Sequence, residues 1–208
     1  MNLSFFYESP PLPLAFYRRS DVVQIAKDLL GKVLITNMED GLCAARIVET
    51  EAYCGATDRA CHAHLNRRTK RTEVMFAAGG VAYVYLCYGI HALFNVVTHE
   101  EGFADAVLVR AVEPLYNVEL MMQRRKIYKP NDYRLTAGPG ALTKAMGIQT
   151  IHYGLSLQGN QIWITDGPPI ADEQIISSPR VGVDYAGEDA LLPWRFRIAG
   201  NRWCSPAK

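Results

Sequence analysis

The segment VAYVYLCYGIHALFNVV, residues 81–97, constrains the fold more than any other part of this 208-residue chain. Residues 82–88 and 93–99 are rich in aromatic and β-branched side chains, which favour strands. Gly89 lies between the two runs, and glycine tolerates the backbone conformations of a tight turn. The segment therefore predicts a protruding β-hairpin with Tyr88 close to its tip.

The rest of the chain mixes helix and strand patterns without a regular strand–helix alternation. Periodicity, an N-cap serine at position 20 and a stop at Gly31 predict a first helix, and Pro114 is placed to open another. Helices are therefore expected over 20–31, 114–126 and 139–147. Strands are expected over 32–36, 44–53 and 105–112, with further short strands in the last third. This mixture predicts an α+β fold, in which helices flank a mostly antiparallel sheet.

The length and composition suit one globular domain. A chain of 208 residues can bury a substantial core, and its 49% hydrophobic and 21% charged residues are ordinary values. No repeat, linker or low-complexity tract divides it, so a single domain is expected over residues 1–208. Residues 1–15 are expected to form an extended lead-in, because three prolines lie at positions 10, 11 and 13.

The cysteines and the N-terminal sequence indicate a location. Five cysteines without a CxxC pattern predict free thiols in a reducing compartment. The opening MNLSFFYESPPLP does not resemble a signal peptide, and no apolar run is long enough to cross a membrane. A cytoplasmic protein without a membrane partner is therefore expected.

Positive charge is clustered although the net charge is only +1. The polar stretch 55–73 carries Arg67, Arg68, Lys70 and Arg71, and long loops inside compact domains are usually functional. A second basic stretch holds Arg124, Arg125, Lys126, Lys129 and Arg134. Such clusters can neutralise phosphates, but for either run alone a solvated surface is the favoured explanation.

Two carboxylates lie on one face of the strand expected over 44–53. Alternation places Ile47, Glu49, Glu51 and Tyr53 on the same side. Two carboxylates are costly to bury without a partner, so a wet strand face is one interpretation. The other is a catalytic Glu51 beside a ring-binding wall that Tyr53 and the nearby His62 would form.

Cys54, Cys61, His62 and His64 offer the thiolate and imidazole groups that usually bind zinc. Their spacing does not match the common patterns of paired ligands, and no CxxC or HxxxH occurs elsewhere. His62 is also explained as a hydrogen-bonded core or loop histidine. A zinc-dependent hydrolase therefore stays an alternative, and no cofactor is expected.

Three polar or aromatic residues, Tyr88, Asn95 and Arg110, are harder to explain by packing alone than their neighbours. A tyrosine at a hairpin tip, such as Tyr88, can act as a wedge between base pairs. Asn95 and Arg110 are polar residues within apolar strands, and each needs a buried partner or a ligand. Tyr83 and Tyr85 share one strand face, where core packing is the simple explanation.

Taken together, these motifs resemble those of the alkyladenine (3-methyladenine) DNA glycosylases, a family of mammalian and bacterial members. The resemblance extends along nearly the whole chain. It is carried by VETEAY, the His62 loop, MF at 75–76, YVYLCYG at 83–89, Asn95, LVRAVEPL around Arg110, AGPG at 137–140, RVGVDYAGE at 180–188 and PWRF at 193–196. Lys70, Thr72 and Ala141 depart from the residues more common in the family, which affects expected contacts with the DNA backbone rather than the chemistry.

The resemblance implies a catalytic role for three positions. Glu51 matches the general base that activates a water molecule to attack the sugar C1′ atom. Arg110 matches a residue that helps to hold this water, and Val181 matches one whose backbone carbonyl does the same. As an adjacent cation, Arg110 should also favour the charged form of Glu51.

The resemblance also implies binding roles. Tyr53, His62 and Tyr85 match the pocket that stacks the extruded base, and Asn95 matches the side chain that opposes the 2-amino group of ordinary guanine. Tyr88 matches the residue that intercalates where the base has left the duplex. The four basic side chains at positions 67, 68, 70 and 71 are expected to contact the DNA backbone.

The expected function is that of a monofunctional glycosylase in base excision repair. It would release alkylated or deaminated purines from double-stranded DNA and leave an abasic site, without a metal. A compact, monomeric, nucleoid-associated bacterial protein is expected. The first alternative is a non-catalytic nucleic-acid-binding module, which would use the basic loops and Tyr88 without needing Glu51.

Overall fold

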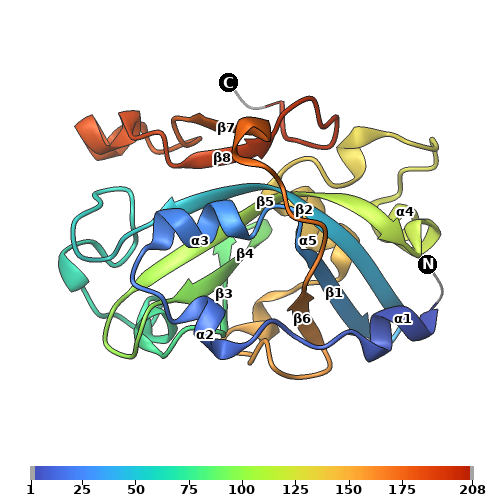
Figure 1. Ribbon diagram of the computed structural model, residues 1–208, viewed down its shortest axis with the longest axis horizontal. Helices are drawn as coiled ribbons and strands as arrows, with labels where there is room; N and C mark the ends of the chain where they lie inside the picture. The colour runs from blue at the N-terminus through green and yellow to red at the C-terminus, as the bar shows by residue number, and fades with distance from the viewer. Residues whose placement is uncertain (1–2, 207–208) are drawn as a thin grey trace.

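The computed structural model describes residues 3–206. Its main element is an eight-stranded sheet in which neighbouring strands are antiparallel (Figure 1). The sheet follows the order β3-β4-β5-β2-β1-β6, and β8 pairs with β2 and with β7. The eight strands described are β1 (Val33–Met38), β2 (Gly41–Tyr53), β3 (Ala82–Cys87), β4 (His91–Thr98), β5 (Asp105–Tyr116), β6 (Ile162–Thr165), β7 (Ile175–Ser178) and β8 (Arg195–Ile198).

Strand β2 occupies the centre of this arrangement. Along one edge it pairs with β5, while its other edge pairs first with β1 and then, over residues 49–51, with β8. Glu51 therefore lies opposite Leu108 on β5 and Arg195 on β8. The second half of β2 is enclosed by strands from distant parts of the chain, which buries both of its carboxylates.

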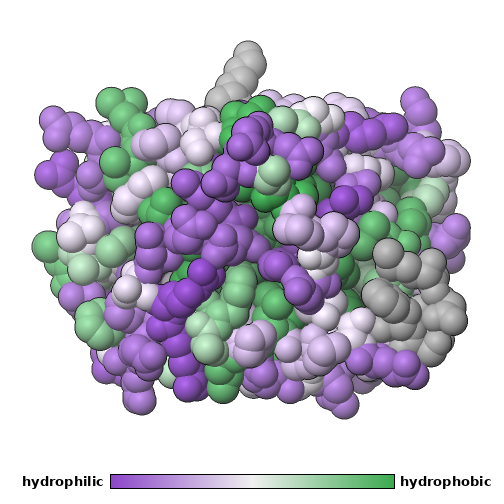
Figure 2. All heavy atoms as spheres, in the orientation of Figure 1, coloured by the Kyte–Doolittle hydropathy of each residue, from purple (hydrophilic) through white to green (hydrophobic). Residues whose placement is uncertain are grey.

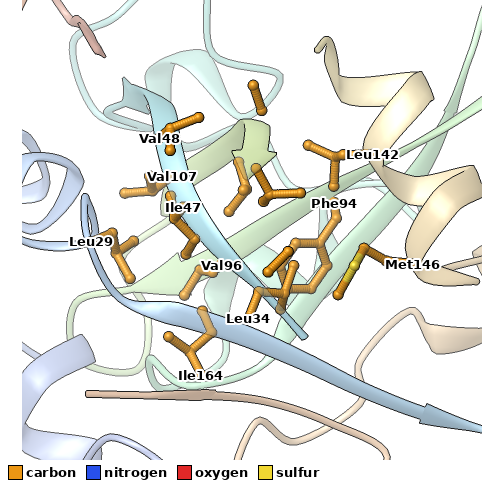
Figure 3. Close-up of a cluster of buried hydrophobic side chains, with 14 of the residues drawn as sticks. Leu29, Leu34, Ile47, Val48, Phe94, Val96, Val107, Leu142, Met146 and Ile164 are labelled. Carbon is orange, nitrogen blue, oxygen red and sulfur yellow. The ribbon is translucent and has the colours of Figure 1, made fainter. Parts of the chain in front are cut away.

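Helices pack against the sheet and complete the core. The α-helices described are α1 (Leu3–Glu8), α2 (Leu14–Tyr17), α3 (Val22–Asp28), α4 (Val118–Arg125) and α5 (Pro139–Met146). The short 3₁₀ helices are η1 (His64–Asn66), η2 (Glu73–Phe76), η3 (Tyr133–Leu135), η4 (Thr150–His152), η5 (Asp172–Gln174) and η6 (Asp184–Leu191). Helix α3 contacts β2 and β5, and α5 contacts β4 and β5. Figure 3 shows part of the resulting core, a buried cluster that extends from Leu29, directly after α3, to Phe94 of β4 and Met146 of α5.

The expected single α+β domain with a large antiparallel sheet is confirmed. Strands β3 and β4 form the predicted hairpin, and the side chain of Tyr88 at its turn is 90% exposed. Hydrophilic side chains cover much of the face drawn in Figure 2, with apolar side chains between them. All five cysteines are free. Among residues 3–206, no helix has the length and apolar character needed to cross a bilayer.

The first predicted helix is shorter than the expected 20–31: α3 is capped one residue later than expected and ends at Asp28. The carboxylate of Asp21, not the hydroxyl of Ser20, accepts a 2.9 Å hydrogen bond from the backbone N–H of Gln24 and caps α3. The chain then turns at Gly31, where φ is +85°. A Cβ atom at this position would lie 2.6 Å from the Pro168 carbonyl oxygen, so glycine is required here.

Two other expectations were wrong in their elements. The lead-in is not extended throughout, because α1 and α2 lie on either side of the prolines; residues 1 and 2 lie outside the described part. Pro114 does not open a helix but lies within β5, opposite Ala45 at a shift in the strand register. Strand β4 pairs with β5 only over residues 105–108, so the edge of β5 that faces β4 is not paired with β4 at Pro114. A proline is tolerated at such an edge, next to a shift in register. Helix α4 starts at Val118, after Asn117 in the left-handed conformation.

Candidate active site

A cleft of about 540 Å³ opens between the hairpin, β5, the loop 55–73 and the segment 181–185. Its inner wall contains buried residues, including Asn95, Leu108 and Arg110. Its rim contains exposed residues, among them Tyr88 and Tyr185. A cleft of this kind, aromatic with a few polar groups at its inner end, is typical of a ligand site.

Several aromatic rings line the cleft. The His62 and Tyr85 rings meet edge to face with centroids 4.7 Å apart, and Tyr83 lies 5.3 Å from Tyr85. Tyr53 also lines the cleft, and the Arg180 guanidinium lies 4.8 Å from its ring centroid. Eight predicted site residues therefore line one cleft: Tyr53, His62, Arg71, Tyr85, Tyr88, Asn95, Arg110 and Val181.

The carboxylate of Glu51 lies directly behind the cleft wall and is fully buried. Its Oε2 atom accepts hydrogen bonds from the Tyr53 hydroxyl at 2.7 Å and from Arg110 Nη1 at 3.3 Å. Its Oε1 atom accepts one from the Val181 backbone N–H at 2.8 Å. All three donors line the cleft. Since a carboxylate has about four acceptor positions, one remains, and it is on Oε1.

Glu49 anchors this arrangement from below. Its Oε1 atom accepts from Arg110 Nε at 3.0 Å, from Arg195 Nε at 2.7 Å and from the Ser205 hydroxyl at 2.8 Å. The Ser205 backbone N–H donates to Oε2 at 2.6 Å. Two buried carboxylates thus meet two buried guanidinium groups, which offsets the cost of removing four charges from water. The wet strand face considered from the sequence is wrong.

His62 is held as a neutral ring. Burial, followed by the charges of Arg71 and Arg67, lowers its pKa to about 4. Its Nε2 atom is 3.2 Å from Arg71 Nη2, and its Nδ1 atom is 2.9 Å from the Tyr83 hydroxyl. A guanidinium can only donate, so Nε2 accepts and Nδ1 carries the proton. The cleft therefore presents an uncharged imidazole, which does not repel a cationic ring.

The four basic residues that were expected to contact DNA, at positions 67, 68, 70 and 71, are all exposed but differ in their contacts. Arg68 makes two hydrogen bonds with Glu73 and lies over the Phe76 ring. Arg71 lines the cleft, with its guanidinium 4.7 Å from the Tyr85 ring centroid. Arg67 and Lys70 remain on the surface of the loop. The sequence did not indicate that Arg71 belongs to the cleft.

Asn95 and the hairpin are held from both sides. The Asn95 side-chain Nδ2 donates to the Tyr83 carbonyl at 3.0 Å, so the amide is fixed in the inner wall. On the outer side, the Thr143 hydroxyl of α5 donates to the Ala92 carbonyl at 2.7 Å. A Cβ atom on Gly140 would lie 2.9 Å from the His91 ring, so the start of α5 packs closely against the hairpin.

The four possible zinc ligands do not gather. Within the described part of the chain, no three His, Cys, Asp or Glu side chains form a group that could hold a metal ion. Cys61 Sγ contacts the Ala104 carbonyl, and the Cys54 sulfur accepts from Thr57. The geometry of these side chains gives no support to the zinc alternative.

The sequence matches the model of the methylpurine-DNA glycosylase family over residues 15–202. The chain belongs to this family. It is similar to three relatives that each carry the name "Putative 3-methyladenine DNA glycosylase". The relative from Bacillus licheniformis is 46% identical over 195 residues, which cover 94% of this chain and 96% of the relative. Those from Bacillus subtilis and Methanocella arvoryzae are 44% and 45% identical, and they cover 95% and 90% of this chain and 98% and 92% of their own lengths.

Membership of the methylpurine-DNA glycosylase family confirms the resemblance and makes the chain an enzyme of the DNA glycosylase class. Three residues of the site were not singled out from the sequence. Glu49 and Tyr83 were noted only as strand residues, and Tyr185 only as part of the RVGVDYAGE motif. For Tyr185 this motif was the available signal, because it continues directly from the segment that contains Val181.

Proposed function

We propose that the protein is a monofunctional DNA glycosylase that releases alkylated or deaminated purines from duplex DNA and leaves an abasic site. The substrates are of the class of 3-methyladenine, 7-methylguanine, hypoxanthine and ethenoadenine. The observation that carries the proposal is the position of Glu51, whose carboxylate is held by three residues that line an aromatic cleft. A non-catalytic binding module would have no need to bury a carboxylate at this position.

The lesion enters the cleft by leaving the duplex. Flipping a nucleotide costs a few kcal/mol, and less for a damaged base that pairs badly. Tyr88 offsets part of this cost by filling the space that the base leaves. Its 90% exposed ring at the end of a braced hairpin supports this role.

Stacking holds the flipped base. Each aromatic contact with a base contributes about 1–3 kcal/mol, and Tyr53, His62 and Tyr85 supply three rings. The neutral state of His62 supports binding of methylated purines, many of which carry a positive charge that aromatic faces attract. Asn95 opposes the 2-amino group of ordinary guanine. Its amide is fixed by the hydrogen bond to Tyr83 and cannot move aside to make room for this group.

Hydrolysis uses a water molecule held at the remaining acceptor position of Glu51 Oε1. The bond between C1′ and the purine nitrogen breaks, and its electron pair leaves with the base. The sugar becomes cationic, and Glu51 stabilises this charge. The water oxygen then bonds to C1′ as Glu51 accepts a proton. The Val181 carbonyl accepts a hydrogen bond from the other O–H of the water, which stays on the sugar hydroxyl, while the Val181 N–H and Arg110 hold Glu51 in place.

The DNA backbone meets the basic loop. Arg67 and Lys70 are exposed and neutralise phosphates next to the cleft mouth, while Arg68 does so after exchanging its contact with Glu73. Arg71 contributes from within the cleft. One lesion needs only one such cleft, so a monomer acting on the nucleoid is sufficient.

A base-release assay on duplexes that each contain one lesion tests the proposal. The expected products are a free purine and an abasic strand that breaks only after alkali treatment. Strand cleavage without alkali would contradict a monofunctional enzyme. Binding of the lesion duplex without release of any base across the substrate panel would favour the binding module instead.

A further inference from the structure

Tyr185 combines an exposed ring with a hydrogen-bonded hydroxyl. Its side chain is 69% exposed, yet its hydroxyl donates a 3.0 Å hydrogen bond to the Ala60 carbonyl. Of the exposed large hydrophobic side chains in the described part of the chain, only Leu86, Tyr88 and Tyr185 line the cleft. The first two lie on the hairpin, whereas Tyr185 lies on η6.

We propose that Tyr185 is a further substrate-binding residue, which packs against the extruded lesion nucleotide at the cleft mouth. This inference rests on the proposed function. The base occupies the inner, buried part of the cleft, so its sugar and outer edge remain near the rim. An aromatic ring that lines the cleft from η6, a segment outside the hairpin, is placed to cover them.

Tyr185 stands on a rigid support. The segment 180–189 is joined to the loop 55–73 by the buried ion pair of Arg180 with Asp58, in which Arg180 Nη2 lies 2.8 Å from Asp58 Oδ1. A second link is the 2.9 Å hydrogen bond from the Arg59 backbone N–H to Asp189 Oδ2. Figure 1 shows these two segments side by side at the left of the view.

Apolar packing adds a third link, because Ala60, Val183 and Ala186 form one buried cluster against Tyr53. The ring of Tyr185 therefore loses little further freedom when a ligand covers it. Folding gains little from this ring, since most of its surface stays in water. A ring that is fixed before binding and exposed beside a ligand cleft is suited to stacking at a low entropic cost.

Equilibrium binding to two duplexes tests the inference. One duplex carries a single ethenoadenine, and the other is identical but undamaged. Substitution Tyr185→Ala is expected to weaken binding to the lesion duplex about tenfold, within the range for loss of one aromatic contact. Binding to the undamaged duplex should change less than twofold. Substitution Tyr185→Phe keeps the ring and should retain most of the lesion preference.

The matched control is Tyr7→Ala. Tyr7 is also an exposed tyrosine whose hydroxyl donates a hydrogen bond, in this case to Asn37 Oδ1. It lies on α1 and contacts β1, which is separated from the hairpin strands by β5 and β2. Equal weakening of both duplexes by Tyr185→Ala, or an unchanged lesion preference, would overturn the inference. The binding experiment does not require base release. A wild-type protein that released no base would therefore refute the proposed function, while the ratio of its affinities for the lesion and undamaged duplexes would still test the role of Tyr185.

Discussion

Glu49 and Glu51 share a single guanidinium group. Arg110 donates from Nε to Glu49 at 3.0 Å and from Nη1 to Glu51 at 3.3 Å. The two carboxylates are two residues apart on β2 and face the same side, as strand alternation requires. The side chain of Glu49 also forms an ion pair with Arg195, whereas the side chain of Glu51 is hydrogen-bonded to Tyr53 and Val181, which line the cleft.

The first prediction concerns Glu49→Gln. The substitution removes the buried negative charge that faces Arg110 Nε and Arg195 Nε, and the loss of one partner of a buried ion pair costs about 3–5 kcal/mol. We expect the free energy of unfolding to fall by about 3 kcal/mol, because glutamine keeps some of the hydrogen bonds. Glu51→Gln should be less damaging to stability. Chemical denaturation of both variants measures the difference, and equal losses would show that Glu49 is not the structural member of the pair.

The second prediction is a pH dependence of stability caused by His62. Its pKa is about 4 in the folded protein, below the ordinary value of 6.5. Between these values the unfolded chain binds a proton that the folded chain does not, so stability falls as the pH is lowered from 7 towards 4. Denaturation at pH 7 and pH 5 should show a loss that is about 2 kcal/mol smaller in His62→Gln. The same loss in both proteins would mean that His62 is not held neutral.

The third prediction separates the role of the Tyr88 side chain in duplex DNA from the effect of its backbone conformation on stability. Tyr88 has a left-handed φ of 51°, which asparagine adopts more readily than tyrosine. Tyr88→Asn should therefore keep or slightly raise the stability, while excision from duplex DNA falls about tenfold because one stacking contact is lost. Excision of the same lesion from single-stranded DNA should change little. Equal losses on both substrates would assign Tyr88 to the base pocket instead.

The fourth prediction concerns selection against guanine. Asn95→Ser removes the amide that Tyr83 holds in the inner wall and makes room for a 2-amino group. Release of undamaged or mismatched guanine should rise, with hypoxanthine release retained. The ratio of the two rates, measured on matched duplexes, reports the effect. An unchanged ratio would remove Asn95 from the role of gatekeeper.

Local patterns predicted much of the fold. The hairpin, the first helix and the central strand follow from periodicity and turn residues, which are properties of neighbouring positions. The prediction of a helix at Pro114 was wrong because the preference of proline for the first position of a helix is a local property. Its place in β5 depends instead on how far β4 pairs along that strand.

The contacts of the site were harder to predict, because they join distant residues. Glu49 meets Ser205 across 156 positions, and Val181 meets Glu51 across 130. Strand alternation placed both carboxylates on one face but gave no information on what would face them. Arg71 likewise looks like its basic neighbours until the fold places it over Tyr85.

The central claim is that Glu51 activates the attacking water, and single-turnover base release by Glu51→Gln tests it most directly. The matched control is Glu119→Gln, an exposed carboxylate on α4. With enzyme in excess over lesion duplex, release by Glu51→Gln should be slower by about 10²–10⁴-fold, the range for loss of a general base. Its affinity for the lesion duplex should stay close to that of the wild type and of the control. Release within a few-fold of the wild-type rate would contradict the account.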